Sequence, residues 1–249
     1  MTKFNQAIII GASSGIGEAL ARELVNNGCI VALVARRGDL LDKLCSEINS
    51  NSDKIKAYSY VHDVVNIDEV PELFQVITRQ LGRLDAIFYT AGTMAKITKD
   101  EYDTSKDSLM IKVNTIGAIA WINEAARRFE RIKKGTIVGV SSVAGDRGRS
   151  RNPAYCSSKA ALNTYLESIR NRIGKLGVKV LTIKPGFIDT EMTKGTKGLF
   201  WLISPESAAK MILKSASKGR KISYIPARWR LVMFIIKSIP SFIFRRLSI

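Results

Sequence analysis

The stretch that decides the fold is Gln6-Ala7-Ile8-Ile9-Ile10-Gly11-Ala12-Ser13-Ser14-Gly15-Ile16-Gly17, which leads into a helical pattern over residues 18–27. The apolar run 6–10 predicts a fully buried strand. The glycines after it allow a tight turn and let a phosphate approach the backbone. A helix that begins there offers that phosphate unpaired N–H groups and a positive dipole end. We therefore predict a dinucleotide site whose phosphates lie against Gly11, Ser13, Ser14, Gly15, Ile16 and Gly17.

A second buried strand, expected at residues 30–35, ends at Arg36-Arg37. A site for NAD would carry Asp or Glu about here, to bind the ribose 2′-hydroxyl. A guanidinium instead suits a 2′-phosphate by its charge and its fork of donors. The pair predicts NADP(H) as the cofactor; the alternative is two solvated arginines at the start of the next helix.

Strand and helix patterns then alternate along the chain. Six strands alternating with helices predict an α/β fold, a Rossmann-type doubly wound parallel sheet in three layers. Ligands in such sheets bind at the carboxyl ends of the strands, where Asp63 can reach an adenine edge. Beyond the first two strands, we expect strands at 54–60, 84–89, 136–140 and 178–183, and helices at 39–49, 67–81, about 101–131 and 155–174.

Tyr155 and Lys159 stand four residues apart in a helical pattern that Pro153 can open. Positions i and i+4 share a helix face, so the phenol and the ammonium point the same way. A nearby positive charge lowers a tyrosine pKa, which would make Tyr155 a proton donor and acceptor near neutral pH. Such pairs are common on helices, and the upstream pattern is what makes this one informative.

Together these residues resemble the short-chain dehydrogenase/reductase family over about residues 4–226. The motifs that carry the resemblance are Gly11-x-x-x-Gly15-x-Gly17, Asp63, Ala91-Gly92, Asn114, Ser142 thirteen residues before Tyr155, Tyr155-x-x-x-Lys159, and Pro185-Gly186 with Thr190. The chain departs from the family at Ile10, where threonine is usual, and at Tyr89-Thr90, where the family has Asn-Asn. These departures bear on local stability and cofactor affinity, and leave the reaction type intact.

The resemblance implies hydride transfer between nicotinamide and a carbonyl or secondary alcohol carbon. Tyr155 would act as general acid and base, and Lys159 would lower its pKa and bind the nicotinamide ribose. Ser142 would polarise the substrate oxygen, and Asn114 would hold a water that links Lys159 to solvent. The cofactor would also contact Asp63, Ala91, Gly92, Tyr155, Lys159, Pro185, Gly186, Ile188 and Thr190.

Charge is unevenly distributed along the chain of 249 residues, whose net charge is +17. No acidic residue follows Glu206, while ten basic residues do. We expect one domain over 1–226 and a basic amphipathic extension over 227–249. The extension is suited to an anionic membrane interface, but the alternative is that it covers the substrate pocket or a subunit interface.

Cysteine usage points to a reducing compartment, because Cys29, Cys45 and Cys156 are scattered and odd in number. With no secretory signal recognised, we expect a cytoplasmic protein that can lie peripherally at the inner face of a membrane. No spacing indicates a metal site, and no motif supports a nucleic-acid partner. By family resemblance we expect a homodimer or homotetramer through helices 101–131 and 155–174.

The substrate side is the least specific part of the sequence. Alternate arginines in the loop 146–151 can bind a phosphate or carboxylate on the substrate, or can simply be solvated. The segment 187–203 has the composition of an apolar lid, and the tail weakly resembles reductases of polyprenyl-phosphate-linked keto sugars. We therefore expect an apolar or lipid-linked carbonyl substrate. The competing hypothesis is a catalytically silent scaffold protein of the same fold.

Overall fold

A parallel sheet forms the centre of the computed structural model, which describes residues 4–98, 100–196 and 198–247. In this part of the chain the sheet has seven strands in the order β3-β2-β1-β4-β5-β6-β7. Their order reverses beside β1, which is the crevice where doubly wound sheets bind ligands. The strands are β1 (Gln6–Ile10), β2 (Ile30–Ala35), β3 (Ala57–Val61), β4 (Ala86–Tyr89), β5 (Gly135–Val140), β6 (Val178–Pro185) and β7 (Ile222–Ile225).

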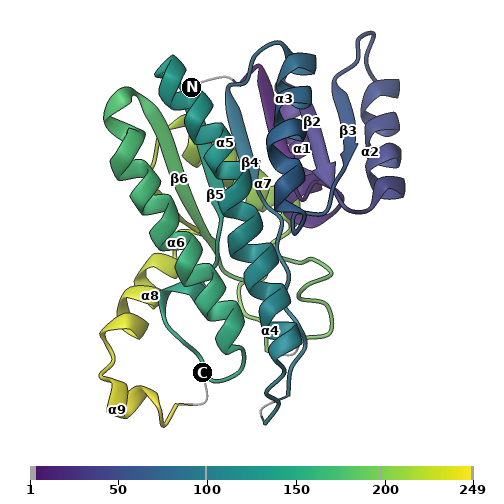
Figure 1. Ribbon diagram of the computed structural model, residues 1–249. Coiled ribbons are helices and arrows are strands. Elements are labelled where there is room, and N and C mark those ends of the chain that lie inside the picture. The colour runs from purple at the N-terminus through teal and green to yellow at the C-terminus, as the bar shows by residue number, and fades with distance from the viewer. Residues whose placement is uncertain (1–3, 99, 197, 248–249) are drawn as a thin grey trace.

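Helices cover both faces of the sheet and complete the three layers (Figure 1). One face packs against α1, α2 and α7, and the other against α3, α5 and α6. The predicted fold class is confirmed. The helices are α1 (Gly15–Asn26), α2 (Gly38–Ser50), α3 (Val70–Leu81), α4 (Thr104–Ile111), α5 (Gly117–Ile132), α6 (Pro153–Ile173), α7 (Pro205–Ser217), α8 (Trp229–Ser238) and α9 (Ser241–Phe244).

The central strands have no solvent-facing side. In β1 the side chains from Ala7 to Ile10 are all fully buried. Ile9 packs in the same core as Leu20 of α1, while Ile8 packs in the core that contains Trp121 of α5. This two-sided burial explains why the strand reads as a continuous apolar run rather than an alternating one.

Two elements were not among the predicted ones, the strand β7 and the helix α7. Four residues are too few to give β7 a recognisable period, and it forms by pairing in parallel with β6. Signals for α7 were present, since Ser204 caps it through a bond from the Ser207 N–H and Pro205 follows in its first turn.

The helix predicted at about 101–131 begins later and is interrupted. It starts at Thr104, after Asp103 caps it by accepting from the N–H groups of Ser105 and Lys106. Between α4 and α5 the residues Lys112–Ile116 form one π-helical turn. Such turns are rare and occur frequently at functional sites, and this one carries Asn114.

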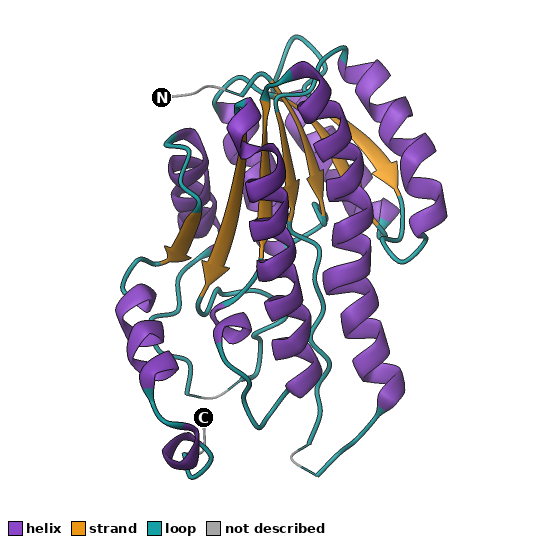
Figure 2. Cartoon of the chain, turned by 60° about the vertical axis from the view of Figure 1, so that its left-hand side comes forward, coloured by secondary structure: helices purple, strands orange, loops and turns teal. Residues whose placement is uncertain are grey.

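The C-terminal helices α8 and α9 lie at the end of the molecule toward which the strands point (Figure 2). Trp229 and Met233 of α8 are buried in a small cluster with Val143. Within the described residues, no helix has the length and apolar character needed to cross a bilayer. In the same part of the chain, no three His, Cys, Asp or Glu side chains are grouped so that they could hold a metal ion.

Candidate active site

A cavity of about 970 Å³ runs along the carboxyl ends of the strands. The glycine loop and Arg36-Arg37 line one end, and Ser142, Tyr155 and Lys159 line the other. Every predicted site residue contributes to its wall except Asn114, which lies behind it. The remaining predicted wall residues are Asp63, Ala91, Gly92, Pro185, Gly186, Ile188 and Thr190.

The glycine loop is packed too closely for any side chain at two of its positions. A Cβ on Gly17 would lie 2.1 Å from the carbonyl oxygen of Gly11, and one on Gly11 would lie 2.5 Å from the Ala91 nitrogen. Gly11 also has a φ of +88°, which L-residues rarely adopt. The loop thus keeps the N-terminus of α1 open, and this cradle fits a pyrophosphate.

Arg37 rather than Arg36 is joined to the glycine loop. Its guanidinium donates to the hydroxyls of Ser13 at 2.9 Å and Ser14 at 2.6 Å. Arg36 turns to Asp63, with 3.5 Å between Nη1 and Oδ2. Both arginines are exposed, so neither arrangement is rigid. A guanidinium beside two hydroxyls is a set of donors that fits a phosphate monoester.

The helix α6 carries Tyr155 and Lys159 to the other end of the cavity. Asn152 caps this helix by accepting from the Tyr155 N–H. Lys159 is buried, and its Nζ donates to the carbonyl oxygen of Val140 at 3.1 Å. The Ser142 side chain is close enough to that of Tyr155 to oppose the rise in the Tyr155 pKa. The three side chains that the motif pattern predicted to act together therefore lie together.

The pKa values of Tyr155 and Lys159 both shift because the two side chains are buried, and the shift of Tyr155 differs from the predicted one. Burial raises the pKa of Tyr155, and the Ser142 side chain opposes the shift without reversing it. Lys159 is itself desolvated, which lowers its pKa to about 8. The net pKa shift of Tyr155 is therefore opposite to the expected lowering, because desolvation of the phenol is the largest effect. The effect of Lys159 on this pKa stays a prediction.

Asn114 acts on the neighbouring backbone in this structure. Its Oδ1 accepts from the Thr93 N–H at 2.7 Å, and its Nδ2 donates to the Thr93 carbonyl and to the Ser158 hydroxyl, both at 2.9 Å. A Cβ on Gly92 would lie 3.3 Å from both Asn114 Oδ1 and Lys159 Nζ. Asn114 thus holds the loop after β4 beside Lys159, and its role with a relay water stays a prediction.

Tyr89 contributes to the site from outside the cavity, which the sequence analysis did not foresee. Its buried hydroxyl donates to the carbonyl oxygen of Val113 at 2.6 Å, inside the π turn that carries Asn114. The signal was available, because Tyr89 stands where the family has asparagine. Its neighbour Thr90 donates to the Ile10 carbonyl at 2.7 Å and so ties β4 to the glycine loop.

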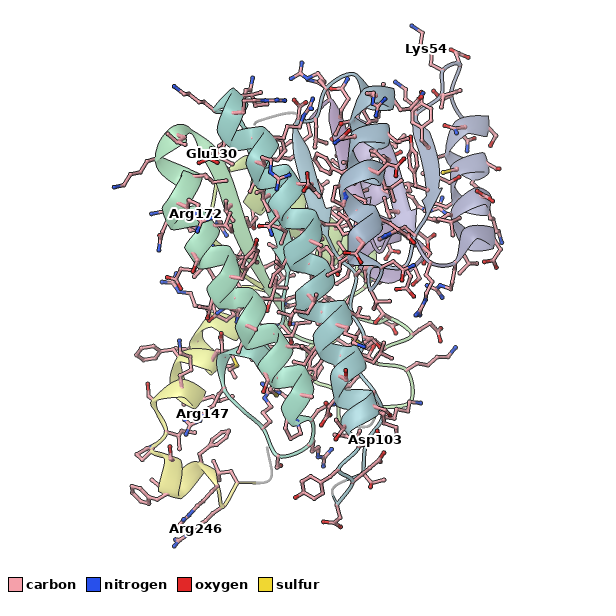
Figure 3. All side chains as sticks on the ribbon, viewed as in Figure 1. Lys54, Asp103, Glu130, Arg147, Arg172 and Arg246 are labelled. Carbon is pink, nitrogen blue, oxygen red and sulfur yellow. The ribbon has the colours of Figure 1, made fainter. Side chains whose placement is uncertain are left out.

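The arginines of the loop 146–151 do not act alike. The guanidinium of Arg147 donates to the carbonyl oxygens of Ile236 and Ile239, both at 2.6 Å, and lies 3.9 Å from the centre of the Phe244 ring. Figure 3 shows it against the C-terminal helices. The idea that Arg147 binds substrate is therefore corrected: it fastens the tail. Arg149 and Arg151 do line the cavity.

The lid segment 187–203 is partly cavity wall and partly a bridge to the tail. Met192 and Leu199 line the cavity. Phe200 and Trp201 pack instead against Trp229 of α8, tilted and edge-to-face, with ring centres 5.1 and 5.8 Å away. The tail thus reaches the substrate end through the lid as well as through Arg147.

Comparison with known proteins gives a consistent result. Residues 5–198 match the model of the family described as short chain dehydrogenase. An uncharacterized oxidoreductase of Staphylococcus saprophyticus is 31% identical over 76% of this chain and 81% of its own. A second, from Staphylococcus aureus, is 30% identical over 75% and 79%.

Solved structures agree with the fold. A short-chain type dehydrogenase/reductase from Mycobacterium ulcerans is 25% identical with a TM-score of 0.80, covering 90% of each chain. The structure of ElxO with NADP bound is 24% identical with a TM-score of 0.79, covering 89% of this chain and 97% of that one. With its family model and these relatives, the chain belongs to the short-chain dehydrogenase/reductase family and is an oxidoreductase.

Proposed function

We propose that this protein transfers a hydride between NADP(H) and a carbonyl or secondary alcohol carbon. The observation that carries the proposal is one cavity with the Ser142, Tyr155 and Lys159 side chains at one end and Arg37 beside Ser13 and Ser14 at the other. Two neighbours in fold support the cofactor: ElxO was solved with NADP, and an actinorhodin polyketide ketoreductase variant with NADPH.

The residues that would hold the cofactor follow the length of the cavity. The glycine loop takes the pyrophosphate, Arg37 the 2′-phosphate, and Asp63 the adenine edge. Ala91, Gly92, Pro185, Gly186, Ile188 and Thr190 surround the nicotinamide end. When bound there, nicotinamide supplies or accepts the hydride.

The chain's own residues manage the proton and the charge on the substrate oxygen. Ser142 donates a hydrogen bond to that oxygen, and Tyr155 Oη gives it a proton as negative charge develops. Lys159 stabilises the phenolate that remains and binds the nicotinamide ribose. Asn114 keeps Lys159 and the loop after β4 in register, and holds the water that resupplies protons.

Arg149 supports a substrate that carries an anionic group beside its apolar part. Its Nε is buried without a hydrogen-bond partner among the described residues, and its Nη2 contacts only a weak acceptor, Met233 Sδ at 3.9 Å. An unsatisfied buried donor is unfavourable, and a carboxylate or phosphate would satisfy it. We expect a keto acid to be reduced better than its methyl ester, and Arg149→Gln to abolish that difference.

The decisive experiment is NADPH oxidation over keto-acyl, retinoid, steroid and keto-sugar substrates with wild type and Tyr155→Phe. General acid catalysis contributes about 10²–10⁴-fold, and we expect a loss of that size with NADPH binding retained. Tyr165→Phe is the matched control, because Tyr165 lies on the same helix and bonds Asn123 instead of facing the cavity. Turnover by Tyr155→Phe at the wild-type rate would rule out the proposed chemistry.

The outer face of the extension 227–249 supports peripheral contact with an anionic membrane. Leu231, Phe234 and Phe242 are 65%, 69% and 60% exposed, and arginines flank them. Such a segment binds through apolar burial and attraction to anionic lipid. We expect sedimentation with phosphatidylserine vesicles to fall in a Leu231→Ser, Phe234→Ser variant. Ile55→Ser changes an exposed apolar residue just before β3, at the opposite edge of the sheet from β7, and should sediment like the wild type.

A homodimer or homotetramer through helices 101–131 and 155–174 is proposed on the family resemblance. Ile116, which lies between α4 and α5, supports it, since it is 40% exposed. Light scattering of wild type and Ile116→Glu tests it: we expect the variant to have a smaller mass.

A further inference from the structure

Behind the reacting end of the cavity lies a polar trio of Asp146, Lys184 and Tyr224, in which the two charged side chains are buried and the tyrosine is half-buried. The Asp146 carboxylate pairs with the Lys184 ammonium through one oxygen and accepts from the Tyr224 hydroxyl at 2.6 Å through the other. The side chains of Asp146 and Lys184 are only 2% and 9% exposed. Lys184 and Tyr224 lie opposite each other in the paired strands β6 and β7, so both reach the same carboxylate.

The trio joins two turns that both line the cavity. Asp146 ends the short turn Val143–Asp146 that begins directly after Ser142, whose hydroxyl accepts from the Ala144 N–H at 3.1 Å. Lys184 directly precedes Pro185-Gly186. The bond between Asp146 and Lys184 therefore connects the turn that presents the Ser142 hydroxyl to the turn at the nicotinamide end.

A contribution to stability does not by itself explain the buried ion pair of Asp146 and Lys184. Desolvating two charges is costly, and well-packed apolar side chains often replace a buried ion pair without loss of stability. A carboxylate held at both oxygens by donors from two strands, however, fixes direction as well as distance. Apolar packing would fill the same space without that constraint.

We propose that Asp146 and Lys184 are positioning residues, which set the Ser142 turn against the Pro185-Gly186 turn so that the substrate oxygen and the nicotinamide meet correctly. Tyr224 orients the carboxylate from β7. The inference rests on the proposed function, because it concerns the geometry of that reaction. Neither charge touches the cavity wall, so each acts through another residue.

The test replaces the trio with apolar side chains of similar size, in the variant Asp146→Leu, Lys184→Met, Tyr224→Phe. We expect its melting temperature to approach the wild-type value and its Kd for NADPH to change little. We expect kcat to fall about tenfold to 10²-fold, as small misplacements near a reacting centre do. Lys184→Met alone should lose both stability and kcat, since it leaves the carboxylate buried and unpaired.

Arg170→Met is the matched control for a purely structural link. Arg170 of α6 also links β6 to the start of β7, because it donates to Val180 O, Thr182 Oγ1 and Lys221 O. Arg170 does not line the cavity. We expect it to lower the melting temperature and leave kcat within about twofold. If the apolar trio variant regains the wild-type kcat together with its stability, the positioning role is overturned.

Failure of the proposed reaction gives a different result from failure of this inference. Absence of any Tyr155-dependent turnover in the wild type counts against the reaction. In that case the fluorescence of bound NADPH tests the positioning role of Asp146 and Lys184, because this emission depends on the surroundings of the nicotinamide. A changed emission in the apolar variant supports the positioning role, and an emission identical to that of the wild type overturns it.

Discussion

The ammonium group of Lys159 lies 5.9 Å from the centre of the Tyr155 ring. Because burial lowers the pKa of Lys159 to about 8, this positive charge disappears within an accessible pH range. The phenolate left after proton transfer then loses its neighbouring cation. We expect kcat/KM for carbonyl reduction to decline above about pH 8.

Lys159→Arg is the variant that checks this origin of the pH dependence, since arginine keeps its charge at every accessible pH. Whatever its absolute rate, its profile should lack the decline near pH 8. A wild-type profile that stays flat to about pH 10 would contradict the assignment.

Burial of the Lys159 ammonium should also lower the free energy of unfolding. The pKa of Lys159 falls from 10.5 to about 8 on folding, so between these values the unfolded chain binds a proton that the native state lacks. Stability from this group therefore rises as pH increases through that window, and the cost is fully present at pH 7.

We accordingly expect Lys159→Met to be inactive yet more stable than wild type at pH 7, by about 1–3 kcal/mol. The advantage should shrink toward pH 10. Urea unfolding at both pH values measures it, and a variant less stable than wild type at pH 7 would show that the bond to Val140 outweighs desolvation.

Arg37 should decide the cofactor preference. Arg37→Gln removes the guanidinium beside Ser13 and Ser14, and hydrogen bonds to charged groups contribute about 1.5–3 kcal/mol. We expect the Kd for NADPH to rise about tenfold to 10²-fold while that for NADH changes little. Arg36→Gln, which loses only a bond to Asp63, should have the smaller effect. Equal losses for both cofactors would disprove the assignment.

Tyr89→Phe probes the π turn. The change deletes one hydroxyl and its hydrogen bond to the Val113 carbonyl, which costs about 0.5–1.5 kcal/mol. Because this carbonyl precedes Asn114, we expect kcat to fall along with stability. Phe88→Leu, a core change in the same strand, serves as the comparison: it should lower stability and spare kcat. A Tyr89→Phe enzyme with unaltered kcat would show that the hydroxyl only stabilises the fold.

Local sequence was sufficient to predict the strand, glycine turn and helix of residues 6–26. The structure of residues 6–17 can be predicted from these residues alone, because a strand buried on both sides and a crowded glycine turn tolerate few other side chains. The i, i+4 spacing on one helix singled out Tyr155 and Lys159, and the family resemblance added Ser142. Their placement on one cavity wall matches the expectation.

What local sequence could not predict depends on partners distant in the chain. Tyr224 and Asp146 bond across 78 positions, and Arg147 meets the tail about 90 positions later. A loop of alternating arginines looks the same whether it faces substrate, solvent or a helix end. The sign of the Tyr155 shift was missed for a related reason, because burial is a property of the fold and not of the i, i+4 pair.

The way Arg147 fastens the tail leaves the side chains on the tail's outer surface free to vary, while Trp229 and Met233 are fixed by burial. The Arg147 donors reach main-chain oxygens, which every amino acid supplies, and the Phe244 ring adds a side-chain contact. Substitutions on the outer surface of α8 can therefore change what this end of the protein adheres to while the tail remains seated. Attachment and turnover are, in this architecture, separately adjustable by mutation.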